Sequence, residues 1–206
     1  DQWVLAGSPG PTEAELAKAS ALANPEVVAR WEAFFNQADA QHELVARYIF
    51  DHVYLSTLAL DESPGELFKL VRSKTAGNSV TEAAAGKATP KVEVIDTPKP
   101  YDNPMVYAGV DQFYYRLQKV TFKPVQKNHF VWRLGQDDIA HLESVFFDRK
   151  WVKDEGFSAP WDVGNPFAMY QAIPEKSRYL FLIENSAIIV AGITSGPVCL
   201  GQTATY

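Results

Sequence analysis

The pattern of hydrophobic and polar residues near the start of the chain predicts two short helices. Thr12 followed by Glu15 matches a capping box, in which each side chain hydrogen-bonds the backbone of the other residue, and it predicts a helix to about Ala23. Asn24-Pro25 places an N-cap residue before a proline suited to the first helical turn, so a second helix is predicted over residues 26–35. Both helix starts follow from local side-chain chemistry.

A longer apolar stretch follows and predicts a third helix. Asp39 is a further N-cap residue, and the predicted helix covers residues 40–60. Its middle carries two ionisable residues, Asp51 and His52. The residues that recur at steps of four and three along one face are Leu44, Tyr48, His52 and Leu55. Because most sides of this helix are apolar, we expect it to be central to the core.

The composition changes after residue 72, and this change divides the chain. We predict another helix over residues 66–73, and then an exposed connection over residues 73–104 that is rich in Ala, Thr, Pro, Gly and Lys. At most one short strand, residues 92–95, is expected within it. An N-terminal helical part, residues 1–72, and residues 105–206 are then two parts of the same domain on either side of the connection.

Residues 113–134 combine aromatic and basic side chains. No acidic residue occurs between Asp111 and Asp137. The aromatic and β-branched content, with residues 126–128 between two runs, predicts a β-hairpin. We call this segment the basic aromatic hairpin; its cations are Arg116, Lys119, Lys123, Lys127 and Arg133.

The last third of the chain predicts more helix. Acidic residues in the first turn favour a helix over residues 137–147. Pro174 begins a segment that periodicity alone leaves open between helix and strand. The apolar runs 48–60 and 179–193 are too short and too interrupted for membrane spans. The predicted fold class is α+β, weighted towards α, with N-terminal helices, the basic aromatic hairpin and C-terminal helices.

Charge and cysteine content exclude several classes of function. Of the 206 residues 47% are apolar, which is enough for a core. The 19 Lys and Arg against 25 Asp and Glu leave a net charge of −6, which argues against nucleic acid as a partner. Cys199 is the single cysteine, so these residues contain no intramolecular disulfide, no Cys-rich zinc site and no Cys-x-x-Cys-His attachment motif for haem c.

The four histidines match no compact metal motif, but two are candidates for chemistry. His52 lies in the apolar helix one turn after Tyr48, where it is an axial ligand, an acid–base group or a core histidine hydrogen-bonded to a neighbour. His129 follows the predicted turn, where a ligand reaches it more easily. No Gly-x-Ser-x-Gly or glycine-rich phosphate loop is present, so hydrolase and nucleotide-enzyme functions are unsupported.

Several segments in order resemble the fatty acid cis/trans isomerase family. The segments that carry the resemblance are residues 29–34, 46–55, 70–75, 100–104, 113–117, 127–131, 165–167, 173–174 and 196–202. The resemblance implies a periplasmic enzyme, peripheral to the membrane, that converts cis double bonds of phospholipid acyl chains to trans as an adaptation to membrane stress. It leaves the oligomeric state open.

The resemblance also implies haem c as cofactor, although the attachment motif is absent from this chain. A carbon–carbon double bond does not rotate until its bond order falls, and a ferric haem that draws electron density from the alkene supplies that change. The chain is therefore either part of a longer haem enzyme or a relative that has lost the haem.

For such an enzyme, residue type suggests roles for particular side chains, which we state as expectations. His52 and His129 are the candidate catalytic residues and iron ligands. Candidate cofactor contacts, to propionate or phosphate oxygens, are Arg47, Tyr48, Arg72 and Arg116. An arginine offers a planar fork for paired oxygens, but pairing with Asp or Glu in the core is an equally open role for the arginines.

Two alternatives stay open at this point. A thiyl radical at Cys199 would add reversibly to the alkene and leave a single bond that rotates; otherwise Cys199 is a small buried hydrophobe. The other alternative is a non-catalytic domain that binds lipid or a partner protein through the basic aromatic hairpin, with Lys119, Lys123 and Lys127 as its contacts.

Overall fold

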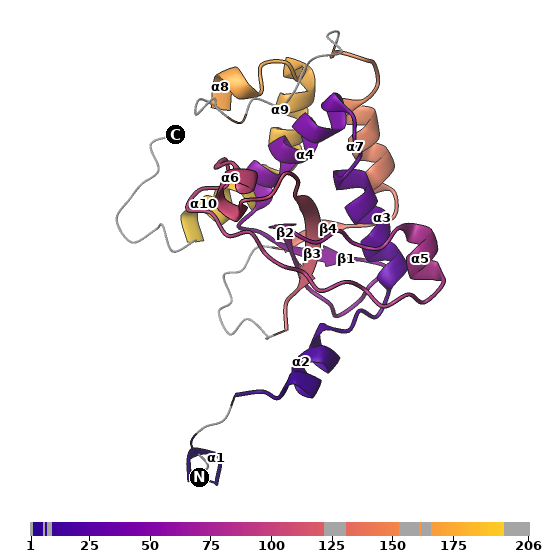
Figure 1. Cartoon of the computed structure of the whole chain (residues 1–206). Coiled ribbons are helices and arrows are strands. Elements are labelled where there is room, and N and C mark those ends of the chain that lie inside the picture. Colours follow the sequence, from indigo (N-terminus) through magenta and orange to yellow (C-terminus); the bar gives the residue numbers. More distant parts are fainter. Residues whose placement is uncertain are drawn as a thin grey trace.

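The computed structural model describes residues 2–5, 7, 10–121, 131–152, 161 and 166–195, and its elements confirm an α+β fold weighted towards helix (Figure 1). The helices are α1 (Gln2–Leu5), α2 (Glu13–Ser20), α3 (Pro25–Phe35), α4 (Ala40–Val53), α5 (Val80–Ala84), α6 (Pro104–Ala108), α7 (Asp138–Phe146), α8 (Pro166–Met169), α9 (Glu175–Glu184) and α10 (Ser186–Ser195). The strands are β1 (Thr57–Leu60), β2 (Phe68–Ser73), β3 (Tyr114–Lys119) and β4 (Val131–Leu134).

One mixed sheet joins these strands in the order β3-β2-β1-β4. β2 pairs antiparallel with both β3 and β1, whereas β1 pairs parallel with β4. The two central strands, β1 and β2, follow α4 directly in the chain. The C-terminal end of α4 is therefore tied closely to the middle of the sheet.

Local side-chain chemistry produces the predicted helix starts. Thr12 and Glu15 form the capping box of α2, which ends at Ser20 and buries no residue. The Asn24 side chain accepts a hydrogen bond from Val27 N at the start of α3. Asp39 accepts from two backbone N–H groups at the start of α4. The predictions of these starts are confirmed.

Two helix predictions are wrong, and the sheet explains both. The helix predicted over residues 40–60 ends at Val53, and residues 57–60 form β1 instead. The helix predicted over residues 66–73 is β2 from Phe68 onward. Pairing with neighbouring strands satisfies the backbone of both segments, and this tertiary contact overrides the local helical pattern.

The basic aromatic hairpin does not form. Its two predicted arms are strands, but β3 and β4 lie at opposite edges of the sheet, with β2 and β1 between them. Each arm finds its partner in an earlier segment of the chain rather than in the other arm. The predicted turn, residues 126–128, lies outside the described residues.

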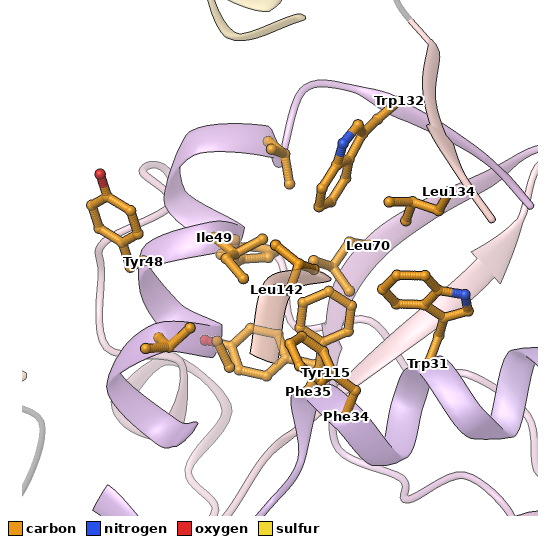
Figure 2. Packing of buried hydrophobic residues seen from close by; sticks show 14 of the residues in the cluster. Trp31, Phe34, Phe35, Tyr48, Ile49, Leu70, Tyr115, Trp132, Leu134 and Leu142 are labelled. Carbon is orange, nitrogen blue, oxygen red and sulfur yellow. The ribbon is translucent and has the colours of Figure 1, made fainter. Parts of the chain in front are cut away.

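Alternate residues of all four strands form the apolar face of the sheet. These residues are Leu58, Leu60, Phe68, Leu70, Tyr115, Leu117, Trp132 and Leu134, and all are buried. Aromatic side chains of α3, including Trp31 and Phe35, gather against this face together with residues of α4 and α7 (Figure 2). The central position predicted for α4 is confirmed, because its residues 44–50 are all buried.

Most side chains of residues 73–104 are exposed, as predicted for a connection. The expected strand at residues 92–95 is reduced to one antiparallel bridge, between Ser73 and Val94. α5 lies within the same connection, and Ala83 is the buried residue of this short helix. The connection also supplies backbone carbonyl groups to buried arginines, as described below.

The last third of the described chain is helical. α7 agrees with the helix predicted over residues 137–147 within one residue at each end. The segment after Pro174, which the sequence left open, is the helix α9, and α10 follows it. In the part of the chain that the structure describes, none of the helices combines the length and apolar character needed to cross a membrane.

Candidate functional site

The C-terminal half of α4 carries four polar side chains in two pairs. Arg47 and Asp51 are one turn apart, and so are Tyr48 and His52. Residues four apart lie on the same side of a helix, so each pair faces one set of neighbours. We call the group formed by Arg47, Asp51, Arg72, Tyr115 and Tyr170 the Asp51 cluster; His52 lies beside it on the same helix.

Asp51 is the carboxylate at the centre of this cluster. The Tyr170 hydroxyl donates a hydrogen bond to Asp51 Oδ2, whereas Oδ1 is buried and accepts none from a described residue. Burial raises the pKa of Asp51 to about 6, against the opposing effects of the Tyr170 hydrogen bond and the charges of Arg47 and Arg72. Asp51 therefore changes charge near neutral pH.

Arg72 and Tyr115 reach the cluster from the sheet. They stand directly opposite each other on β2 and β3, so their side chains leave the same face. The Arg72 guanidinium carbon lies 4.9 Å from the centre of the Phe50 ring. The centre of the Tyr115 ring lies 5.4 Å from the centre of the same Phe50 ring. Burial raises the pKa of the Tyr115 hydroxyl, which has no hydrogen-bond partner among the described residues.

Arg72 and Arg47 both donate to the connection. Arg72 Nη1 donates to the carbonyl oxygens of Pro100 at 2.7 Å and Asp102 at 2.9 Å, and its Nη2 donates to Thr97 Oγ1. Arg47 Nη2 donates to Tyr101 O at 3.3 Å. The two guanidinium groups thus tie residues 97–102 to α4 and β2. Their contact with a cofactor stays a prediction.

The Trp161 ring also contacts Arg47. The guanidinium carbon of Arg47 lies 3.7 Å from the centre of the Trp161 ring, within cation–π distance. The Trp161 ring also contacts Phe113 edge to face, with ring centres 5.7 Å apart. Arg47 is buried and contacts both an aromatic ring and the connection.

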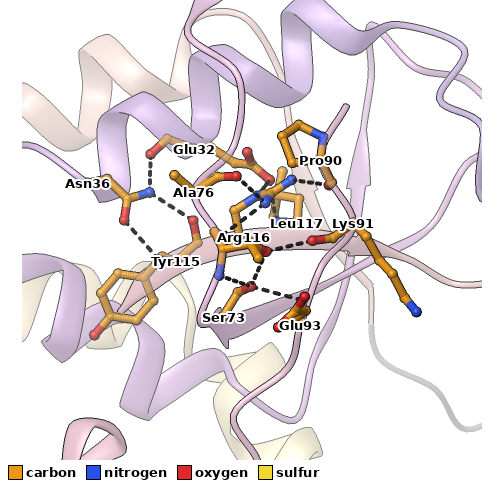
Figure 3. Close-up of polar contacts among 11 residues, drawn as sticks. Glu32, Asn36, Ser73, Ala76, Pro90, Lys91, Glu93, Tyr115, Arg116 and Leu117 are labelled. Atoms are coloured by element: carbon orange, nitrogen blue, oxygen red, sulfur yellow. Dashed lines mark hydrogen bonds and ion pairs between the residues drawn. The ribbon is translucent and has the colours of Figure 1, made fainter. Parts of the chain in front are cut away.

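Arg116 has the structural role that the sequence left open. Its Nε pairs with Glu32 Oε1 at 2.9 Å, and both side chains are buried. Glu32 Oε1 also accepts a hydrogen bond from Leu117 N at 2.9 Å (Figure 3). The remaining Arg116 nitrogens donate to carbonyl oxygens of the connection, at Thr75, Ala76 and Pro90. Arg116 lies on the face of β3 opposite to Tyr115, so it is separated from the Asp51 cluster.

His52 is held with one ring nitrogen fixed. Its Nδ1 lies 2.7 Å from Tyr48 O, a carbonyl that can only accept, so Nδ1 carries the proton and donates it. Burial lowers the pKa of His52, which favours the neutral ring. Nε2 then carries the lone pair, and no described residue hydrogen-bonds it.

Aromatic rings surround His52. The ring centre of Tyr48 lies 4.3 Å from that of His52, and those of Tyr170 and Phe181 lie 6.4 Å and 6.3 Å away. The Tyr48 hydroxyl donates to Arg178 O at 3.2 Å, and burial raises its pKa. Tyr48 therefore packs against His52 and remains protonated; its contact with a cofactor stays a prediction.

The other sequence candidates fall elsewhere. His129 and Cys199 lie outside the described residues, as do Lys123 and Lys127. Lys119 pairs with Glu66 at 2.6 Å and donates to Ala21 O at 2.5 Å. Among the residues that the structure describes, no three His, Cys, Asp or Glu side chains gather as a metal site.

Sequence reasoning missed most of the Asp51 cluster. Asp51 had a signal, a carboxylate inside an apolar helical run, and this pattern indicates a buried and partnered acid. Tyr170 and Tyr115 had none, because both join the cluster through the fold. Glu32 likewise becomes a buried partner of Arg116 only when α3 packs beside β3.

The fold and the site together define a helix-weighted α+β domain with a buried Asp–Arg–Tyr cluster beside a histidine whose Nε2 is hydrogen-bonded by no described residue. The family model of fatty acid cis/trans isomerase (CTI) matches residues 1–206, so the chain belongs to this family. No curated protein and no solved structure gives a significant match to the chain.

Proposed function

We propose that this chain acts in the conversion of cis double bonds to trans in the acyl chains of membrane phospholipids. The observation that carries the proposal is the family match over all 206 residues. We further place the protein in the periplasm, at the membrane surface, where a change from cis to trans stiffens the bilayer under stress. The chemistry requires a cofactor, and haem is the group that the family implies.

His52 fits an axial ligand of haem iron in its chemistry. An imidazole ligand commonly donates its second N–H to a backbone carbonyl, which fixes the ring and leaves the other nitrogen for the metal. His52 has this arrangement, with Nδ1 held by Tyr48 O and Nε2 without a partner among the described residues. Its lowered pKa keeps the ring neutral, as a ligand requires. Covalent attachment has no counterpart in this chain, which contains one cysteine.

The need for a redox group follows from the barrier. Rotation about the partial double bond of a peptide already costs about 18–20 kcal/mol, and a full double bond resists rotation more. A bound ferric haem supplies an electron-poor centre that weakens the double bond. The protein's own part is to orient the acyl chain and to exclude water.

The aromatic surroundings of His52 suit a protein that excludes water and orients an acyl chain. Tyr48, Tyr170 and Phe181 present ring surfaces to the imidazole, and all three residues are buried. Such a surface excludes water and packs against apolar groups. The basic aromatic hairpin of the alternative function does not form, so this alternative loses the structure on which it depended.

A spectroscopic titration tests the cofactor part of the proposal. Haem added to the purified full chain should give a visible spectrum of a histidine-ligated iron, and His52→Ala should abolish it. His141→Ala is the matched control, because His141 lies on α7, exposed, and pairs with Glu184 at 2.9 Å. Equal spectra for His52→Ala and the unmodified protein would contradict the role of His52.

An activity assay tests the function itself. Incubation of the haem-loaded protein with a phospholipid that contains a cis monounsaturated chain should yield the trans isomer, measured by gas chromatography of the fatty acid esters. A well-folded, haem-loaded protein that forms no trans product would overturn the proposal.

A further inference from the structure

Buried polar atoms of Asp51, Arg72 and Tyr115, in the Asp51 cluster, have no hydrogen-bond partner among the described residues. They are Asp51 Oδ1, Arg72 Nε and the Tyr115 hydroxyl oxygen. A buried polar atom without a partner costs about 1–3 kcal/mol, so three such atoms in one cluster need a physical explanation.

The fold brings the three residues that carry these atoms close together. Arg72 and Tyr115 are opposite residues on β2 and β3, which puts their Cβ atoms about 4.5–5.5 Å apart. Both side chains lie against Phe50, the residue that precedes Asp51 on α4. The negative charge of Asp51 also acts on both groups. It raises the pKa of Tyr115, and it raises the pKa of Arg72 against the lowering caused by burial.

The hydrogen-bonding capacities of the three atoms are complementary. Asp51 Oδ1 accepts, Arg72 Nε donates, and the Tyr115 hydroxyl does both. We propose that the three groups bind one ordered water molecule, which donates to Asp51 and accepts from Arg72 while the Tyr115 hydroxyl completes its coordination. About three hydrogen bonds are what a buried water usually makes in a protein.

The surrounding charges favour a neutral ligand over an ion. The Asp51 carboxylate repels an anion at this position, and the Arg72 guanidinium repels a metal cation. A water molecule satisfies both groups without a net charge. It would join α4, the helix that carries His52, to β2 and β3. This inference does not depend on the proposed isomerase activity.

A crystal structure of the full chain at high resolution tests the proposal directly. The expected result is one density peak within hydrogen-bond distance of all three atoms. A direct contact between Arg72 Nε and Asp51 Oδ1, with no peak between them, would overturn it. Crystals soaked in bromide provide a second criterion, because an anomalous peak at this position would show an anion site in place of a water site.

A solution experiment remains decisive if crystals do not form. Water-selective nuclear Overhauser spectra should show a long-lived water next to the Tyr115 ring, and Tyr115→Phe should shorten its residence time. Tyr107→Phe is the matched control, since Tyr107 lies on α6 and is 55% exposed. Absence of a long-lived water at Tyr115 in the unmodified protein would refute the site without any variant.

Discussion

The Tyr170 hydroxyl donates a hydrogen bond to Asp51 Oδ2, across a separation of 119 residues in the chain. The contact joins the segment after α8 to the last turn of α4. It also gives Oδ2 a hydrogen-bond donor, while burial of the Asp51 carboxyl group disfavours its charged form. The pH response of the folded protein therefore depends on this pair.

Asp51 should make the stability of the protein fall as pH rises through the acid range. Burial raises its pKa from 3.8 to about 6, so the folded state binds more protons than the unfolded state between these values. The free energy of unfolding then decreases from about pH 4 to about pH 6, by roughly 3 kcal/mol in total. Asp51→Asn removes this contribution.

Chemical denaturation at several pH values measures the effect. The difference in unfolding free energy between the unmodified protein and Asp51→Asn should change across pH 4–6 in favour of the variant as pH rises. Asp111→Asn, at an exposed position, serves as the control. A difference that stays constant with pH would show that Asp51 is not buried in this way.

Tyr170→Phe should raise the pKa of Asp51 further, because the hydroxyl now lowers it. The lost donor should also cost about 1–3 kcal/mol of stability. Tyr48→Phe is the matched variant: it removes the hydrogen bond to Arg178 O and leaves the Asp51 carboxylate untouched. Carbon NMR of the carboxyl group follows the titration, and equal Asp51 pKa values in both variants would contradict the assignment.

Gly77→Ala should destabilise the protein. A Cβ at Gly77 would overlap Glu32 Oε2 and lie 3.1 Å from Arg116 Nε, within a pair that is already buried. Overpacking of this kind costs about 1–3 kcal/mol. At Gly10, by contrast, a Cβ meets no atom within 4 Å, so Gly10→Ala should be close to neutral. Thermal melts of the two variants should differ, and similar melting temperatures would argue against the close contact.

Arg116→Met should be strongly destabilising, by about 3–5 kcal/mol, because it leaves the buried Glu32 carboxylate without its partner. Lys87→Met breaks an ion pair too, but the pair of Lys87 with Glu82 is exposed and screened by solvent, so its loss should change stability much less. Urea denaturation of both variants checks the contrast. A small effect at Arg116 would mean that Glu32 finds another partner or becomes protonated at little cost.

The sequence predicted the parts of the fold that depend on nearby residues. Asn24 and Asp39 begin their helices by hydrogen bonds within three residues, so their role is visible in the sequence. Residues 57–60 and 68–73 were predicted as helix because their strand character depends on pairing, for example of Leu58 with Trp132. A pairing partner 74 positions away, 132 minus 58, leaves no local signal.

The candidate site likewise contains residues with local partners, which the sequence predicts, and residues with distant partners, which it does not. His52 was found from its place in an apolar helix, and its hydrogen bond to Tyr48 O is local. The roles of Arg72 and Arg116 were not decided by residue type, because their partners are carbonyl groups of the connection and a glutamate on α3. Tyr170 joins the cluster only through the packing of the C-terminal helices. Chemistry carried by one helix is thus predictable, whereas chemistry assembled from several segments is not.

The measurement that tests the account most directly is the ratio of trans to cis product formed by His52→Ala and by the unmodified protein. Both are assayed as haem-loaded full chains on the same cis monounsaturated phospholipid, with His141→Ala as the control and circular dichroism to confirm folding. We predict that His52→Ala forms trans product only at the background rate, while His141→Ala keeps its activity. Undiminished isomerisation by a folded His52→Ala protein would contradict the account.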